Sequence, residues 1–373
     1  MEILEHLAVK IGNRVAGKPE AFRAGDYLAG KFSELGLEVE FQEFKFVSWE
    51  LDSPPTLNIR SPVKEEIAVG PMPYTESTPD EGVTGYLKRI GTAFIVPGLF
   101  EWPKYAVIGK DGRELAYLLG HLDGKAIPMP NTQPMFMSPQ GIISEADHMR
   151  IEGWLAEGEV EVSFRSLGHY APGYVGRNVI ATLPGKSEET VVVCAHYDSA
   201  LGTSGAVDNA SGVQALYDTA CRIIEAKPER TFRFIAFDAE EWDLLGSKFY
   251  VSEAKTREKL DEIKACINLD TVGIGNTLFC WVGPDFFHGQ VDQILHRLGV
   301  KDKFKVDYSK PLSGSDHYPF WLEEIPVVMI LFWPYEAYHL PADSIDIVDA
   351  NVTRTATDIA YEIATILKRA GTR

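Results

Sequence analysis

Acidic residues and histidines follow several of the apolar segments in the second half of the chain. They occur in six short groups: His196-Tyr197-Asp198, Asp208 within the Gly-rich segment 202–212, Asp238-Ala239-Glu240-Glu241, Asp270, Ser315-Asp316-His317 and Tyr338-His339. Each group alone is common in proteins that bind no metal. Together they form a mixed imidazole and carboxylate set, which suits zinc, cobalt or manganese better than calcium or an iron–sulfur cluster. The pattern therefore indicates a site for divalent metal ions.

The charge of these groups indicates how many ions the site would hold. Five carboxylates are available, from Asp198, Asp208, Glu240, Glu241 and Asp270. Without cations, their mutual repulsion would force their pKa values up. Two divalent ions balance three ligating carboxylates and one hydroxide, which leaves Glu240 as a general base and Asp198 as the acceptor that orients His196. The Gly-rich segment does not suit a phosphate, because it lacks a Gly-Lys-Ser/Thr ending and carries Asp208.

The apolar segments around these groups predict the scaffold that would hold them. Short, wholly apolar stretches predict buried strands, and stretches with a helical period predict amphipathic helices. The expected strands are 191–195, 231–237, 265–269, 278–282 and 326–332, and the expected helices are 19–35, 211–226, 244–254 and 351–370. Strand, loop and helix alternate from residue 178 onward, which predicts a doubly wound α/β/α sandwich with a mixed, mainly parallel sheet. Ligands of such folds bind outside the carboxyl ends of the strands.

A change in composition marks an insertion in this scaffold. Of the 22 prolines, 13 lie between Pro54 and Pro172, which favours short strands and turns over long helices. We therefore expect the first part of the core at 1–51, an inserted, mostly β domain at 52–172 and the main part of the core at 173–373. Within the insertion, 92–96 and 160–164 are expected to be strands and 147–155 a short helix.

Composition excludes several classes of function. The chain has 373 residues and a formal net charge of -18, so it would repel a nucleic-acid backbone. No apolar run approaches the roughly 20 residues that cross a bilayer, and residues 1–6 lack the basic and apolar parts of a secretory signal. We therefore expect no nucleic-acid partner, no membrane partner and a cytoplasmic location. The four cysteines have no CxxC spacing, and we expect buried free thiols.

The same groups resemble the motifs of a known family, the co-catalytic dizinc exopeptidases. This family includes bacterial leucyl aminopeptidase, plasma carboxypeptidase and glutamate carboxypeptidase, with glutaminyl cyclase and the transferrin receptor as diverged members. The matching strings are His196-Tyr197-Asp198-Ser199, Val207-Asp208-Asn209-Ala210-Ser211-Gly212, Phe237-Asp238-Ala239-Glu240-Glu241-Trp242, Asn268-Leu269-Asp270, Ser315-Asp316-His317, and Tyr338-His339 with Asp343. The segment 52–172 resembles the protease-associated domain that many relatives carry at this place.

The resemblance implies a set of metal ligands. The implied ligands are Asp208 as the bridge between two zinc ions, His196 and Asp270 on one ion, and Glu241 and His339 on the other. Cobalt or manganese could replace zinc. The resemblance also implies a cis peptide bond between Asp208 and Asn209.

Other matching residues would act on water and substrate. Glu240 would take the proton from a water that bridges the two ions and pass it to the leaving amine. Tyr338 would stabilise the oxyanion, and Asp316 and His317 would line the substrate pocket. His317 also competes with His339 as the last ligand. The family's ligand follows an aromatic residue and precedes an acid four residues on, and His339 fits both conditions.

These features predict an exopeptidase that cuts the N-terminal bond of peptides, because a free α-amine suits an acidic, metal-bearing site. A carboxypeptidase is the alternative, and it would need a basic group such as Lys310 for the substrate carboxylate. Acyl transfer of the glutaminyl-cyclase kind, with one zinc, is disfavoured because His196 and Asp270 are both present. A non-catalytic scaffold would be expected to lack ligands. Side-chain preference, native metal and oligomeric state are left open.

Overall fold

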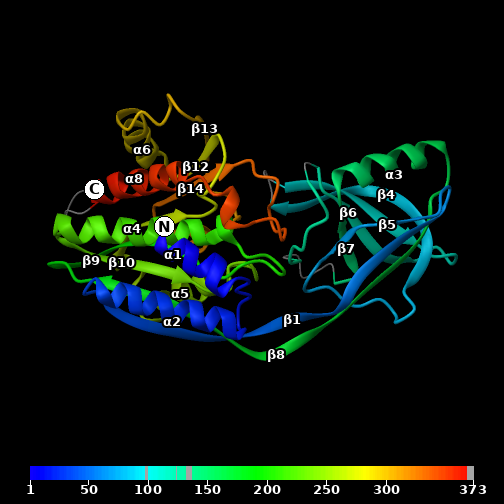
Figure 1. The fold of residues 1–373 in the computed structure, drawn as a ribbon, viewed down its shortest axis with the longest axis horizontal. Coiled ribbons are helices and arrows are strands. Elements are labelled where there is room, and N and C mark those ends of the chain that lie inside the picture. The colour runs from blue at the N-terminus through cyan, green and yellow to red at the C-terminus, as the bar shows by residue number, and fades with distance from the viewer. Residues whose placement is uncertain (97–99, 123, 132–136, 368–373) are drawn as a thin grey trace. The chain divides into compact units, whose positions relative to one another are not determined.

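The computed structural model of the protein describes residues 1–373 except 97–99, 123, 132–136 and 368–373 (Figure 1). It divides into a core unit, Met1–Phe46 with Val175–Arg373, and an inserted unit, Val47–Tyr174. The sequence places the insertion at 52–172. The chain leaves and re-enters the core unit within strands β1 (Glu38–Ser61) and β8 (Glu161–Leu183). Because both boundaries fall inside a strand, no turn marks them in the sequence.

The sheet of the core unit is mixed and mainly parallel, which confirms the predicted fold class. In order across the sheet its strands are β13 (Lys305–Ser309), β12 (Thr277–Gly283), β14 (Val327–Trp333), β11 (Ile263–Leu269), β9 (Ser187–His196), β10 (Arg230–Phe237) and β8. The neighbours β13 and β12, β14 and β11, β11 and β9, and β9 and β10 are parallel. The pairs β12 with β14 and β10 with β8 are antiparallel.

Both faces of this sheet are buried, because alternate residues of a strand point to opposite faces. On β9, Val191 and Val193 join one apolar cluster, whereas Val192 and Cys194 join another. The first cluster includes residues of α1 (Glu2–Glu5), α2 (Pro19–Glu34), α4 (Ser211–Ala226), α6 (Asp285–Arg297) and α8 (Ala350–Leu367). The second includes residues of α5 (Leu245–Thr256) and α7 (His317–Leu322). Helices on both faces explain why the strands read as continuous apolar runs.

The short elements of the core unit are η1 (His6–Ile11), η2 (Ala206–Ala210), η3 (Leu260–Glu262) and η4 (Ile345–Ile347). Of these, η2 directly precedes α4 and carries one of the candidate ligands, Asp208. Among the described residues, all four cysteines are free thiols, three of them buried and Cys221 partly exposed. No helix in the described part of the chain is long and apolar enough to span a membrane.

The inserted unit is mostly β and has its own apolar core. Its main strands follow the order β8, β4 (Val83–Val96), β5 (Phe100–Ile108), β6 (Glu114–Gly120), β7 (Gln140–Ile143) and β3 (Val69–Pro71). The strand β2 (Glu65–Ile67) pairs with β1. The one helix of the described insertion, α3 (Glu145–Glu157), covers the predicted segment 147–155. It begins at Ser144, whose side chain accepts a hydrogen bond from the backbone N–H of Asp147, as is typical of a helix cap.

Candidate metal centre

Three neighbouring parallel strands bring candidate ligands to one edge of the core sheet. The strand β9 ends at His196, and Phe237 at the end of β10 is its register partner. On the other side of β9, Asn268 pairs with Cys194, so Asp270 comes level with His196. Glu240 and Glu241 follow β10 directly. The site therefore lies outside the carboxyl ends of the strands, where the sequence predicts it.

The bridging candidate Asp208 reaches this edge from η2. Its backbone is not helical, with φ of -113° and ψ of 91°. The peptide bond between Asp208 and Asn209 is cis, as predicted. The Asn209 side chain donates a hydrogen bond to the carbonyl of Leu269 and accepts one from the backbone N–H of Thr271. These bonds attach η2 to the end of β11, and so fix Asp208 beside Asp270.

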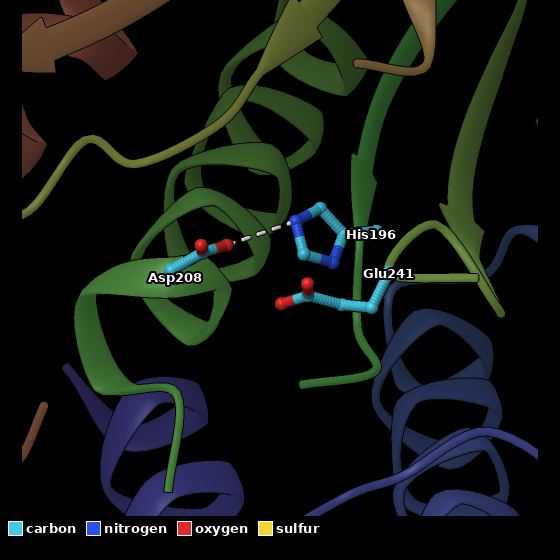
Figure 2. A group of neighbouring side chains, drawn as sticks. All are labelled: His196, Asp208 and Glu241. Atoms are coloured by element: carbon cyan, nitrogen blue, oxygen red, sulfur yellow. Dashed lines mark ion pairs between the residues drawn. The ribbon is translucent and has the colours of Figure 1, made fainter. Parts of the chain in front are cut away.

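The carboxylate of Asp208 lies between two histidines. Its Oδ1 is 3.1 Å from Nε2 of His196, and its Oδ2 is 3.5 Å from Nε2 of His339. Figure 2 shows Asp208 and His196 facing each other, with Glu241 beside them. The Oε2 of Glu241 is 3.0 Å from Nε2 of His339. Asp270 Oδ1 is 3.3 Å from Nε2 of His196. All five predicted ligands thus face the same small space.

Ligand atoms are close enough to share metal ions. Those of His196, Asp208 and Glu241 lie within 4.8 Å of one another, and so do those of His196, Glu240 and Asp270. The family resemblance pairs Glu241 with His339 and assigns Glu240 as the base. In the structure, Glu241 Oε2 is 3.0 Å from Nε2 of His339, and ligand atoms of Glu241 and His196 also lie within 4.8 Å of each other. Glu240 Oε2 is 3.9 Å from Nε2 of His196.

Asp198 orients both sides of the cluster. Its Oδ1 is 3.3 Å from Nδ1 of His196, the ring nitrogen that faces away from Asp208. The same carboxylate accepts hydrogen bonds from the backbone N–H groups of Glu240 and Glu241, at 3.1 and 3.2 Å. Asp270 is held in a similar way, because Ser315 donates a 2.6 Å hydrogen bond to its Oδ2. Ser315 is not among the predicted site residues, although it stands beside Asp316 in a matching motif.

Burial and mutual repulsion shift the pKa values of these groups. Burial raises the pKa of Glu240 and of Glu241, and neighbouring carboxylates raise them further. Burial would lower the pKa of His196, but Glu240 and Asp270 outweigh it and raise the net value. The pKa of His339 is likewise raised, chiefly by Glu241 against the effect of burial. For Asp208, burial acts to raise the pKa, but hydrogen bonds from both histidines lower it.

The donor set fits divalent cations. Five carboxylates and two imidazoles are an oxygen and nitrogen set of the kind that zinc, cobalt and manganese prefer. The Oε1 atom of Glu241 is buried and has no hydrogen-bond partner in the described structure. A buried carboxylate oxygen without a partner costs free energy, and a cation would remove that cost. The residues present therefore fit a metal centre.

Left-handed backbone conformations turn several residues of this cluster toward it. Ala239 has φ of 58°, Thr271 has 55° and His339 itself has 53°. Ala239 immediately precedes Glu240, and Thr271 immediately follows Asp270. His339 is itself a candidate ligand. Residues other than glycine rarely adopt this backbone conformation, which costs about 1–3 kcal/mol. Such conformations concentrate at functional sites, where the surrounding structure holds them.

The predicted substrate residues differ in position. Tyr338 stacks on His339 with ring centroids 3.9 Å apart. Asp316 and His317 are completely buried at the start of α7, and His317 packs against Trp281 with ring centroids 5.5 Å apart. Burial lowers the pKa of His317 to about 3. Their contact with a substrate stays a prediction. Lys310 follows β13 and is exposed.

The fold and the cluster together define an α/β protein with a doubly wound sheet, whose carboxyl edge carries buried carboxylates and histidines that could hold metal ions. Residues 178–364 match the family model described as Peptidase family M28. The chain belongs to this family. The match to the family model does not include the inserted unit, so the resemblance of that unit to a protease-associated domain stays a prediction.

Known proteins similar to this chain include aminopeptidases. Aminopeptidase YwaD of Bacillus subtilis (strain 168) is 32% identical over 184 residues, which are 47% of this chain and 40% of that protein. The chain thus spans less than half the length of this curated relative. The structure of a zinc aminopeptidase from Bacillus subtilis has a TM-score of 0.72 and 20% identity, covering 100% of this chain and 95% of that one. A peptidase M28 precursor from Shewanella amazonensis SB2B has a TM-score of 0.79 and 21% identity, covering 100% and 93%. At these identities the solved structures show the fold.

Proposed function

We propose that the protein is a metal-dependent aminopeptidase that removes residues from the N-terminus of peptides. The observation that carries this proposal is the position of Asp208, whose two carboxylate oxygens face two different histidines. A carboxylate in that position can ligate two ions at once. Membership of an M28 peptidase family and the similarity to an aminopeptidase support the reaction class.

The ions would be held by His196, Asp208, Glu241, Asp270 and His339. Zinc is our first choice, and cobalt or manganese are the alternatives. When bound, a pair of such ions lowers the pKa of a water toward about 7 and polarises the scissile carbonyl. The remaining chemistry falls to side chains of the chain itself.

Glu240 is the proposed general base. Its carboxylate is 3.9 Å from Nε2 of His196, so Glu240 borders the ligand cluster. Its side chain is 11% exposed. Burial raises its pKa, and a general base works best with a pKa near the working pH. Glu240 would accept a proton from the attacking water at a carboxylate oxygen and deliver it to the leaving amine.

Tyr338 is the proposed donor to the oxyanion. Burial and the nearby carboxylates raise the pKa of its hydroxyl, so the O–H keeps its proton at neutral pH. Stacking on His339 fixes the ring beside the candidate ligands. A preorganised O–H donor of this kind stabilises negative charge as it develops in the transition state.

The first experiment compares matched peptides that differ only at their ends. We expect the zinc-loaded protein to shorten a peptide with an amidated C-terminus and to leave an N-acetylated peptide intact, as followed by mass spectrometry. The opposite result would establish the carboxypeptidase alternative and direct attention to Lys310. Cleavage of neither peptide, or fewer than two ions bound per chain, would contradict the proposed function.

Glu240→Gln tests the base. Glutamine keeps the size of the side chain but cannot accept the proton, and general acid–base transfer contributes roughly 10² to 10⁴ in rate. We expect turnover to fall by that factor while both zinc ions stay bound. Full activity in this variant would show that another group is the base.

A further inference from the structure

Arg14 is a completely buried arginine next to the candidate metal centre. Its guanidinium donates hydrogen bonds to five backbone carbonyls, those of Leu7, Gly12, Tyr197, Ser204 and Gly205. Arginine has five N–H donors in a rigid planar fork. Buried arginines usually pair with a carboxylate, but these five hydrogen bonds of Arg14 all go to backbone oxygens. The Arg14 side chain therefore holds backbone segments in place and does not form an ion pair through these hydrogen bonds.

Three of these carbonyls belong to one loop, which runs from the end of β9 to η2. We define this loop as residues 197–208, so that it begins directly after His196, includes Asp198 and extends into η2 as far as Asp208. Arg14 Nε is 2.7 Å from the carbonyl of Tyr197 at one end, and Nη2 is 3.0 Å from that of Gly205 near the other. One rigid group thus spans the segment between two candidate ligands.

Neighbouring groups complete the attachment of this loop. The Asn13 side chain donates to the carbonyls of Ala200 and Thr203 at its middle. Asp343 accepts hydrogen bonds from the backbone N–H groups of Val207 and Asp208, at 2.8 and 3.1 Å. A buried cation thus holds backbone oxygens of the loop, and a buried carboxylate holds backbone N–H groups at its end.

The loop is shaped to admit the guanidinium. Gly205 has φ of 55°, and a Cβ at this position would lie 3.0 Å from Nη2 of Arg14 and 2.4 Å from the carbonyl oxygen of Asp208. Any other residue at 205 would collide with the turn. Burial lowers the pKa of Arg14 to about 10, against the opposing effect of Asp198 and Asp343. Arg14 therefore stays protonated at neutral pH, with all its donors available.

We propose that Arg14 is a positioning residue, which holds the loop 197–208 in the shape that places His196 and Asp208 around a shared metal ion. The inference rests on the proposed function, since it takes the site to be a metal centre. Residues that orient metal ligands typically contribute 10- to 100-fold to metal affinity.

The test is zinc affinity in the full-length variant Arg14→Met, measured by competition with a chromophoric chelator well below the unfolding temperature. Methionine fills much of the volume but donates no hydrogen bond. We expect zinc binding to weaken by about 10- to 100-fold. The matched control is Arg230→Met, because Arg230 is also buried but lies at the start of β10, bonded to Glu189 and to the carbonyl of Leu367. The Arg230→Met variant should unfold at a lower temperature than the wild type but keep its zinc affinity within about twofold.

Wild-type zinc affinity in Arg14→Met would overturn the inference, and so would an equal loss in both variants, which would show a general effect of lost stability. If Arg14→Met does not fold, Arg14→Lys takes its place. Lysine carries its donors on one nitrogen and cannot reach both ends of the loop, so zinc binding should still weaken, and unchanged binding would overturn the inference. A wild-type protein that binds no zinc would contradict the proposed function instead.

Discussion

At the scale of single residues, the carboxylate of Asp198 connects two parts of the site. One oxygen lies 3.3 Å from Nδ1 of His196, and the two oxygens together accept the backbone N–H groups of Glu240 and Glu241. The turn that carries two glutamates is thus hydrogen-bonded to this side chain, and the imidazole that faces Asp208 lies against it. Its effect on the metal is indirect, through the ligands that it orients.

Asp198→Asn tests this role. Asparagine keeps one acceptor oxygen, but its amide N–H₂ would face groups that are themselves donors. We expect zinc affinity and kcat to fall by about 10- to 100-fold, as measured by chelator competition and by peptide cleavage. Asp302→Asn is the control, because Asp302 is exposed at a turn and should change neither quantity. An active, tightly zinc-binding Asp198→Asn protein would contradict this role.

The two late histidines give a second prediction. His339 Nε2 lies 3.0 Å from Glu241 and 3.5 Å from Asp208, whereas His317 packs on Trp281. We expect His339→Ala to lose close to one bound zinc per chain and His317→Ala to keep both, as counted by elemental analysis after removal of excess metal. The reverse result would make His317 the ligand.

The candidate ligands could be predicted from the sequence, but Arg14 could not. His196 and Asp270 follow apolar segments directly, so the strands that position them are visible in the sequence. The partners of Arg14 are backbone carbonyls, and that of Tyr197 lies 183 residues further along the chain. A backbone carbonyl has no residue type, so no spacing or motif marks such a contact before the fold is known.

At the scale of elements, the buried strands and amphipathic helices of the core follow the apolar pattern closely. The long strands β1 and β8 do not, since the prolines of the insertion predict only short strands. β1 contains Pro54 and Pro55 and still extends over 24 residues. Proline fixes φ near -65° and removes one N–H donor, which an extended strand tolerates wherever that N–H is not needed for pairing. Composition shows where prolines are, but pairing decides whether they end a strand.

The end of α4 offers a stability prediction. Lys227 follows the helix in the left-handed conformation, with φ of 48° and ψ of 67°, and it is exposed. Glycine adopts this conformation without strain and is the usual residue at this position. We expect Lys227→Gly to stabilise the protein by about 0.5–1 kcal/mol, because the relieved strain of roughly 1–2 kcal/mol exceeds the extra chain entropy that glycine loses on folding. The measurement is the midpoint of unfolding in urea, which should rise. Lys227→Ala is the control, since alanine keeps the strain, and an equal gain in both would contradict this explanation.

At the scale of the whole molecule, an acidic chain buries several carboxyl groups around one edge of its sheet. Burial raises the pKa of Asp238 and of Asp343 to about 7. Such groups hold protons in the folded state that they release when the chain unfolds, so they make the folded state less stable as pH rises from about 4 to about 7. His196 and His339 have raised pKa values, and their contribution to stability is lost as pH rises through those values.

The directions of these pKa shifts predict how pH and bound metal together affect the stability of the protein. Asp208 has a lowered pKa, so its stabilising contribution is lost only in acid and stays constant from pH 6 to 8. The metal-free protein should therefore unfold at a lower temperature at pH 8 than at pH 6. Zinc should act in the opposite sense, because ligands must be deprotonated to bind it and competition from protons weakens as pH rises.

Thermal unfolding at pH 6, 7 and 8, with chelator or with excess zinc, measures both effects. Each tenfold gain in zinc affinity adds about 1.4 kcal/mol of stability, which corresponds to roughly 2–3 °C in unfolding temperature for a protein of this size. The gap between the zinc-loaded and chelated curves should therefore widen steadily from pH 6 to 8. Glu240→Gln should show the same widening, because it keeps the five candidate ligands. A constant gap would mean that no titrating ligand holds the zinc, and a chelated curve that rises with pH would contradict the assignment of buried, protonated carboxyl groups around this edge of the sheet.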